Sequence, residues 1–135
     1  MYTTEETQKK VWEKGTVIEG FDPYIWRKDF AGAWIRKDLY GTTDDYGWNV
    51  TAFQPYRLGG TSSEDNLIPI HWKNEVEKGD NYRIFRTSIS NNGKIVNGKI
   101  EVGCNVEYGQ IWEIDKQIPK KEDFLGKIKS FFKIK

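Results

Sequence analysis

The side chains that could carry chemistry lie between positions 36 and 80 of the sequence. His71 is the single histidine, and histidine is the side chain best suited to proton transfer near neutral pH. Asn66 and Asn74 carry amides that either bind a ligand or cap a loop or a helix. A lone histidine is more often packed or on the surface than catalytic, and scattered cations are more often an ordinary solvated face. The basic residues that could surround a phosphate group are Arg36, Lys37, Arg57, Lys73 and Lys78.

Short elements must hold these residues in place. A capping box at residues 3–6 predicts a helix over residues 5–14, which Gly15 ends. Strands are expected over residues 33–39 and over residues 48–53, because both runs are rich in apolar and aromatic residues and have turn residues beside them.

The second half of the chain contains a loop, a helix and then several strands. Residues 57–66 are predicted to be a polar loop, and the run 67–72 leads into a short helix that Gly79 ends. Further strands, separated by Asn-Asn-Gly, Asn-Gly and Tyr-Gly turns, are expected at 82–90, 93–106 and 108–114. The predicted class is α+β, in one domain that spans residues 1–135. The residues expected to form its core are Trp34, Trp48 and Trp72.

The last twenty residues differ from the rest in charge. They carry seven lysines against two acidic residues, a balance of +5, whereas the other residues carry 14 basic and 18 acidic side chains, a balance of −4. The spacing of apolar residues predicts a basic amphipathic helix over residues 120–135. Packing against the body is the default for this helix, docking on a partner protein comes second, and lying on an anionic membrane comes third.

Residues 31–80 contain an ordered series of motifs. The run Trp48–Pro55 is followed by Gly59-Gly60, by Asp65-Asn66-Leu67, and then by Asn74 with Lys78 four positions later. This order and spacing resemble the HNH endonucleases, the ββα-metal nucleases. The resemblance implies an HNH-like ββα core over residues 31–80, preceded by the N-terminal helix. A β-rich extension with hairpins at 82–115 and the helix at 120–135 would follow it.

The resemblance also implies a chemistry, metal-assisted phosphodiester hydrolysis, and a place for each of its groups. In the family, a strand Asp holds the metal and the next residue, a His, is the general base; these positions hold Thr51 and Ala52 here. Asn66 matches the residue that orients the base, and Asn74 matches the metal ligand on the helix. Alanine cannot accept a proton, and a neutral hydroxyl is a poor Mg²⁺ ligand. A single engineered change at position 52 would not account for Thr51, so natural loss of the pair is favoured.

Composition narrows the function classes. The chain has 6 Trp, 7 Tyr and 7 Phe, too many aromatic residues for a disordered protein. The lone Cys104 excludes an internal disulfide framework and a cysteine-based zinc site. With no recognisable signal segment and no apolar run long enough to cross a bilayer, a cytoplasmic setting is expected. The acidic body is a poor general surface for nucleic acid.

The leading hypothesis is a catalytically inactive HNH-like binding protein that needs no cofactor. Such a protein would suit bacterial or phage defence or counter-defence, for example as an inhibitor. A partner protein comes first as its ligand, and a nucleic acid or a nucleotide second. One alternative is an active Mg²⁺-dependent nuclease with a rearranged site that uses His71, Asn74 and either Asp45 or Asp65. Another is a membrane-associated accessory protein that binds through residues 120–135. The residues expected to bind the ligand are Arg36, Lys37, Arg57, His71, Lys73, Asn74 and Lys78.

Overall fold

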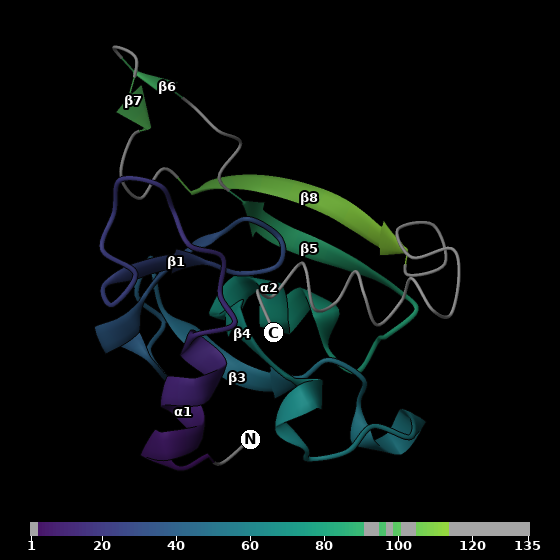
Figure 1. Ribbon diagram of the computed structural model, residues 1–135. Helices are drawn as coiled ribbons and strands as arrows, with labels where there is room; N and C mark the ends of the chain where they lie inside the picture. The colour runs from purple at the N-terminus through teal and green to yellow at the C-terminus, as the bar shows by residue number, and fades with distance from the viewer. Residues whose placement is uncertain (1–2, 91–94, 97–98, 101–104, 114–135) are drawn as a thin grey trace.

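The computed structural model describes residues 3–90, 95–96, 99–100 and 105–113, which form short helices and short strands (Figure 1). The class is α+β, as predicted. The helices are α1 (Glu5–Trp12) and α2 (Trp72–Lys78), with single 3₁₀ turns η1 (Lys37–Leu39), η2 (Tyr56–Leu58) and η3 (Glu64–Asn66). The strands are β1 (Trp26–Lys28), β2 (Trp34–Arg36), β3 (Trp48–Ala52), β4 (Leu67–His71), β5 (Ile84–Ser90), β6 (Ile95–Val96), β7 (Lys99–Ile100) and β8 (Val106–Glu113).

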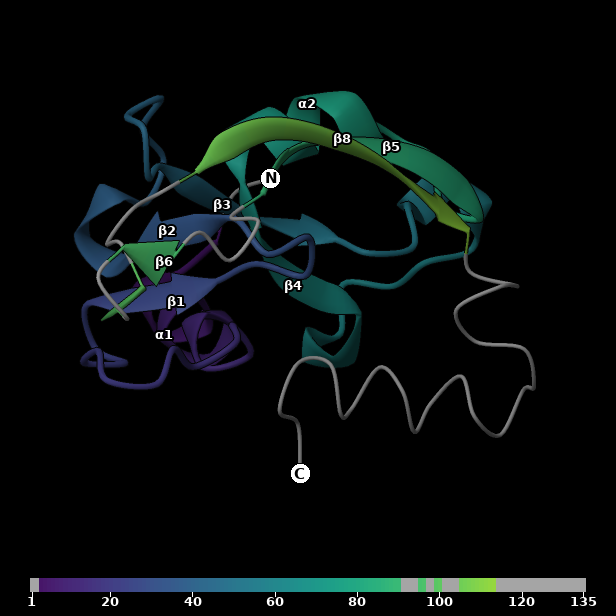
Figure 2. The ribbon, with the colours of Figure 1, turned by 90° about the horizontal axis from the view of Figure 1, so that it is seen from above.

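The described strands pair two by two, and every pair is antiparallel. β1 pairs with β2, β3 with β4, β6 with β7, and β5 with β8. Figure 2 shows β5 and β8 as a curved ribbon that arches over α2, against which β5 packs. The chain therefore runs from β3 through a loop to its antiparallel partner β4, and continues directly into α2.

Helix α1 is anchored at both ends. Its N-cap is Thr4, whose hydroxyl accepts from the backbone N–H of Thr7. The helix ends at Trp12, earlier than the predicted residue 14, and the chain leaves it through tighter turns in which the N–H groups of Lys14 and Gly15 donate to the carbonyls of Val11 and Trp12. The guanidinium of Arg27 binds the carbonyls of Glu13 and Gly15, both at 3.0 Å, and so satisfies acceptors just past the helix end.

The β3–β4 hairpin separates two apolar clusters, one on each face. Successive strand residues point to opposite faces, so Trp48, Val50 and Ala52 pack with Val11 and Trp12 of α1. On the other face, Ile68 and Ile70 of β4 pack with residues of β5 and of the β1–β2 turn, in a cluster completed by Phe30, Ala31, Phe53 and Phe85. Trp34 and Trp48 are buried as predicted, whereas Trp72 is only half-buried, because its ring lies at the start of α2 with its N–H bonded to the Asp44 carbonyl.

Several predicted boundaries shift. The strand expected over 33–39 is shorter and consists of β2 alone. It ends at Arg36 because the backbone N–H of Lys37 donates to the carbonyl of Ile25 and the 3₁₀ turn η1 follows. The run that leads into α2 is itself the strand β4, paired with β3 in the register Thr51↔Ile68. Strands occur within 82–90 and 93–106, but the predicted turn residues 91–93 and 97–98 lie outside the described residues. The predicted helix at 120–135 lies outside them too. The Tyr-Gly turn predicted at 108–109 is wrong, because β8 runs through both residues and pairs with β5.

Candidate functional site

Thr51 and Ala52, where the resemblance puts a metal ligand and a general base, lie on opposite faces of β3. Ala52 is 8% exposed and belongs to the cluster around α1. Asn49, two positions earlier in β3, is on the same face as Thr51. Its side-chain amide donates to the Glu75 carboxylate of α2 at 2.7 Å, so this face of the strand is directed toward α2. A side chain at position 52 therefore meets apolar core, and the two positions do not share a site.

His71, the alternative base, is fully buried and has both ring nitrogens engaged. As the N-cap of α2, its Nδ1 accepts from the backbone N–H of Lys73 at 3.1 Å. Because Nδ1 accepts, Nε2 carries the proton and donates to the Asp45 carbonyl at 2.7 Å. Burial lowers the pKa of His71, which favours this neutral form. With no free lone pair, His71 acts as a helix cap and is not available to a water or a ligand.

The single histidine makes this state measurable. We expect its C2 proton resonance to titrate with a pKa below the ordinary value of 6.5. Below pH ~6.5 the unfolded chain takes up a proton that the folded one resists, so stability should fall as pH drops, by at most ~1.4 kcal/mol per pH unit. His71→Asn keeps a capping side chain and should remove this slope between pH 6.5 and 5. A resonance that titrates at or above 6.5 would contradict the burial described here.

Asn74 is the centre of a buried hydrogen-bond network and is 0% exposed. Its Nδ2 donates to the Asp29 carboxylate at 2.9 Å and to the Ile89 carbonyl at 3.0 Å. Its Oδ1 accepts from the backbone N–H groups of Ser88 and Ile89, at 2.7 and 2.8 Å. All four hydrogen-bonding positions of the amide are therefore filled, and Asn74 joins α2 to β5 and to the β1–β2 turn.

Asp29 is the partner that fixes this network. Its Oδ1 accepts from the backbone N–H groups of Ala31 and Ala33, at 3.0 and 2.9 Å. Its Oδ2 accepts from the backbone N–H of His71 at 3.0 Å as well as from Asn74. Burial raises the pKa of Asp29, and these hydrogen bonds act in the opposite direction. Four N–H donors converge on the carboxylate, so it serves as a structural tie between the turn and the start of α2.

Lys78 occupies the interior between β3 and α2. It is 1% exposed, its ammonium donates to the Ala52 carbonyl at 3.4 Å, and it lies over the rings of Phe53 and Phe85, at 5.9 and 5.5 Å. Burial lowers its pKa to about 8. This side chain therefore occupies the space between residues 52–53 and the end of α2.

Asn66 closes the loop that joins β3 to β4. Its Oδ1 accepts from the backbone N–H of Gln54 at 2.9 Å, and its Nδ2 donates to the carbonyls of Gln54 and Thr61. The same loop needs Gly60, because a Cβ there would come within 1.7 Å of the Gln54 carbonyl oxygen. Asn66 is a loop-closing residue, and no catalytic group lies at the position it would have to orient.

Of the predicted binding residues, Arg36 and Lys37 line a common hollow. Lys73 is half-buried with its ammonium over the Trp72 ring at 5.5 Å, and Arg57 pairs with Asp80 at 3.2 Å. His71, Asn74 and Lys78 are in the interior. The predicted set therefore divides into three groups. His71, Asn74 and Lys78 are structural, Arg57 and Lys73 are two separate surface cations, and Arg36 and Lys37 are an adjacent pair.

The hollow beside Arg36 and Lys37 has a volume of about 460 Å³. Its other lining residues are Tyr24, Ile25 and Asp38. The backbone N–H of Lys37 donates to the Ile25 carbonyl at 3.0 Å, which holds the η1 turn against the segment before β1. A second, smaller hollow of about 210 Å³ shares Lys37 and extends between α1 and the start of β3.

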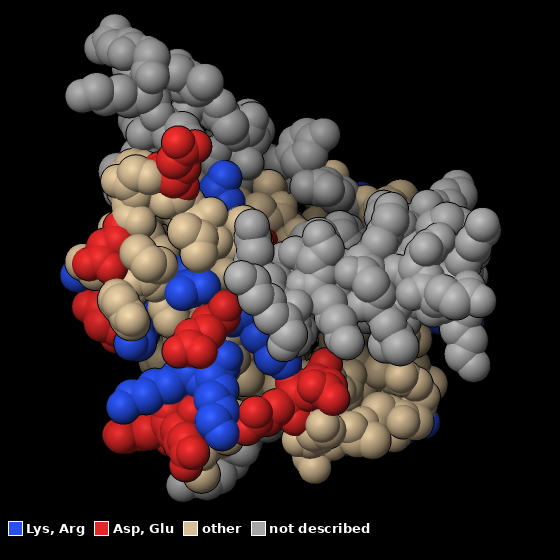
Figure 3. All heavy atoms as spheres, in the orientation of Figure 1, with Lys and Arg blue, Asp and Glu red and all other residues tan. Residues whose placement is uncertain are grey.

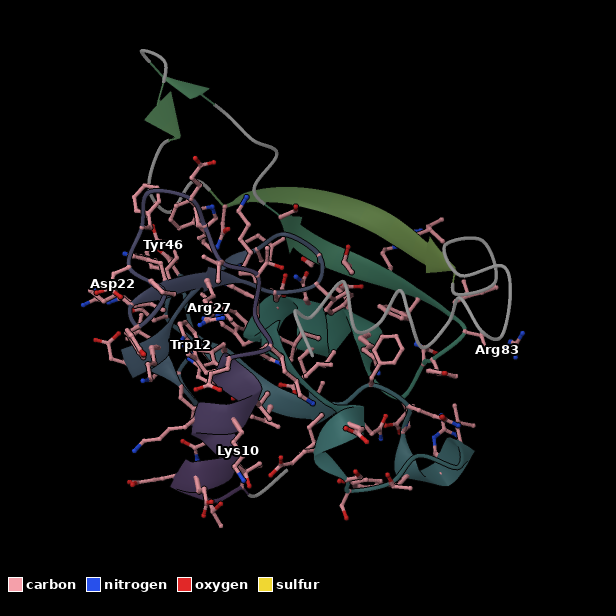
Figure 4. The ribbon with its side chains drawn as sticks, in the orientation of Figure 1. Lys10, Trp12, Asp22, Arg27, Tyr46 and Arg83 are labelled. Atoms are coloured by element: carbon pink, nitrogen blue, oxygen red, sulfur yellow. The ribbon has the colours of Figure 1, made fainter. Side chains whose placement is uncertain are left out.

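Aromatic rings and cations alternate around the larger hollow, the one beside Arg36 and Lys37. The Lys37 ammonium lies 5.4 Å from the centre of the Tyr24 ring, and the Arg36 guanidinium lies 5.9 Å from that of Trp26. Trp26 meets Tyr46 edge to face at 4.9 Å. Figure 4 places Tyr46 and Asp22 at the end of the molecule that carries β1, with Arg83 at the opposite end. The hollow thus combines exposed aromatic area with positive charge.

No protein-family model, no curated protein and no solved structure matches this chain. Within the described residues, no three or more His, Cys, Asp or Glu side chains gather closely enough to hold a metal ion. No helix in the described part of the chain is long and apolar enough to cross a membrane.

Charge on the described surface is mixed. Figure 3 shows Lys and Arg side chains interspersed with Asp and Glu on the face that carries α1. Lys10 there lies 3.5 Å from both Glu6 and Glu64. Such a surface does not provide the broad positive field that favours a long polyanion.

Two groups of residues were missed from the sequence, for different reasons. Asp29 has local partners only in its turn, Ala31 and Ala33, whereas the contact that ties the network together is with Asn74, 45 positions away. Tyr24 and Trp26, in contrast, stand in the aromatic run Tyr24-Ile25-Trp26. That aromatic content is a local indication of a surface site, but no regular period accompanies it, because Tyr24 lies in a turn and Arg27 is buried.

Proposed function

We propose that this protein is a non-catalytic binding protein built on an HNH-like ββα scaffold. The order of β3, loop, β4 and α2 supports the scaffold, since it is the order that the motif resemblance implies. The observation that carries the proposal is the buried Lys78 side chain, whose ammonium lies between strand and helix against the Ala52 carbonyl. A divalent ion would meet the Lys78 ammonium there, and no carboxylate lies at position 51 to attract it.

The binding surface in this proposal is the hollow at Tyr24, Arg36 and Lys37. A partner protein remains one class of ligand, because Tyr, Trp and Arg are the residues that most often dominate protein interfaces. A long nucleic acid is disfavoured by the acidic balance of residues 1–115. A setting in bacterial or phage conflict, in which the protein acts as an inhibitor, remains part of the proposal and rests on the resemblance alone.

A plasmid-nicking assay with Mg²⁺ and Mn²⁺ tests the non-catalytic part. We expect no metal-dependent cleavage by the wild-type chain, because His71 has no free nitrogen and position 52 cannot accept a proton. Metal-dependent cleavage that His71→Ala abolishes would overturn the proposal in favour of a nuclease with a rearranged site. Cleavage that survives His71→Ala with equal rate would point to a contaminant.

Restoring the family pair is expected to fail. In the double variant Thr51→Asp with Ala52→His, the carboxylate would face α2 and the imidazole would enter the apolar cluster around Val11 and Trp12. We expect no Mg²⁺-dependent nicking, together with a loss of ~1–3 kcal/mol of folding free energy from the overpacked core. Thr51→Asp alone, at a half-buried position, should retain most of its stability. Cleavage by the double variant would mean that an intact catalytic geometry survives.

A further inference from the structure

Arg36 keeps most of its donors available. Its guanidinium lies over the Trp26 ring, and its Nε lies 2.9 Å from the Asp38 carboxylate in an exposed ion pair. Within the described part of the chain, no acceptor is bound to Nη1 or Nη2. A guanidinium fixed at one edge and free at the other is oriented to bind a phosphate or carboxylate with two parallel hydrogen bonds.

The groups beside Arg36 fit a ligand that is both anionic and flat. Tyr24 is 71% exposed, so its ring can take a planar partner on the area that the Lys37 ammonium leaves open. Ile25, which is 43% exposed, adds an apolar contact in the same hollow. Stacking of a base on an aromatic ring contributes to affinity in proteins that bind single-stranded nucleic acid.

From this geometry we propose that the hollow binds a nucleotide with one phosphate group. The phosphate bonds to the free edge of Arg36 and to Lys37, and the base stacks on Tyr24 against Ile25. The local charge suits a single phosphate, because the two cations are offset by Asp38, which leaves a balance of +1. A volume of about 460 Å³ lies within the range of small-molecule sites.

This inference rests on the proposed binding function, and it selects the ligand class. A long polyanion would extend beyond the hollow onto a surface of mixed charge, whereas a mononucleotide uses only the residues that line it. An acidic peptide could occupy the Arg36 edge but would leave the Tyr24 ring without a planar partner. Because the site has two parts, we expect the base and the phosphate to make separate contributions to the binding affinity.

Titration of the ¹⁵N-labelled full chain with AMP and GMP, followed by NMR, tests the proposal. We expect amide shifts at residues 24–26 and 36–38, and binding at least about tenfold tighter than that of adenosine or inorganic phosphate alone, a difference of ~1.4 kcal/mol. Arg36→Gln should weaken AMP about tenfold or more while leaving adenosine unchanged. Tyr24→Ala should weaken adenosine and AMP but leave inorganic phosphate unchanged.

Arg57→Gln is the matched control, because Arg57 is also an exposed arginine paired through Nε to an aspartate, Asp80, and lines neither hollow. It should leave AMP binding unchanged. The proposal is overturned by the absence of any nucleotide binding up to about 5 mM, by shifts confined to other residues, by equal losses in the two arginine variants, or by a preference for acidic peptides over AMP. Any of these results would overturn nucleotide binding alone. The non-catalytic proposal is tested separately by the nicking assay, and it would stand as long as that assay shows no metal-dependent cleavage.

Discussion

Asn74→Ala is expected to remove a large part of the folding free energy of the protein. The substitution deletes four buried hydrogen bonds and leaves the Asp29 carboxylate without one of its donors. Unsatisfied buried groups cost ~1–3 kcal/mol each, and more when the group is charged. A domain of this size is stable by only ~5–15 kcal/mol. We therefore expect a loss of at least ~4 kcal/mol, measured by urea unfolding.

Asn49→Ala is the matched control for that variant. Asn49 lies at a half-buried position on β3, and its side chain makes one hydrogen bond, to Glu75 of α2. Its loss should cost ~0.5–1.5 kcal/mol. If Asn74→Ala and Asn49→Ala lost similar amounts, the network around Asp29 would not hold α2, β5 and the β1–β2 turn together as described.

Elements with local signals were predictable from the sequence. Thr4 caps α1 because its hydroxyl reaches the backbone N–H of Thr7, three positions away. Gly79 ends α2 because its φ of 52° is strained for other residues. Strand β3 alternates buried and half-buried residues, which is the period that a sequence reveals. These features depend on neighbours within a few positions.

Elements defined by distant partners were harder to predict. All five residues of β4 are buried, so the strand lacks the alternation that distinguishes it from other apolar runs. Its partner β3 lies across the loop at 53–66. The carbonyls just past α1 likewise have a distant partner, Arg27, whose guanidinium binds them from 12 and 14 positions later in the chain. Such contacts depend on tertiary structure, so local sequence propensity does not predict them.

The site residues show the same division between residue type and environment. The sequence identified His71, Asn74 and Lys78 as able to do chemistry, and their side chains do make specific polar contacts. What it could not supply was burial, which turns the histidine into a cap and the amide into a tie. Arg36 and Lys37 keep a binding role as a proposal because they reach the surface beside Tyr24.

Lys78→Met is expected to stabilise the protein at pH 7. The pKa of Lys78 is about 8 in the folded protein, against 10.5 for an ordinary lysine. Because one pKa unit corresponds to 1.36 kcal/mol, burying the charged amine costs ~3 kcal/mol at pH 7. Methionine fills a similar volume without charge, and it loses only the contact to the Ala52 carbonyl and the interaction with two rings. A net gain of ~1–3 kcal/mol is expected.

The pH dependence of the same variant separates charge from packing. Between pH 8 and 10 the unfolded wild-type chain binds more protons at Lys78 than the folded one, so wild-type stability should rise with pH in this window. Lys78→Met should reduce that rise, and its advantage should shrink as pH increases, as measured by urea unfolding at pH 7, 8, 9 and 10. Lys73→Met, on the same helix but half-buried, should change stability by at most ~0.5 kcal/mol and keep the rise. A destabilised Lys78→Met variant at pH 7 would show that the ammonium contributes more through its ring and carbonyl contacts than its burial costs.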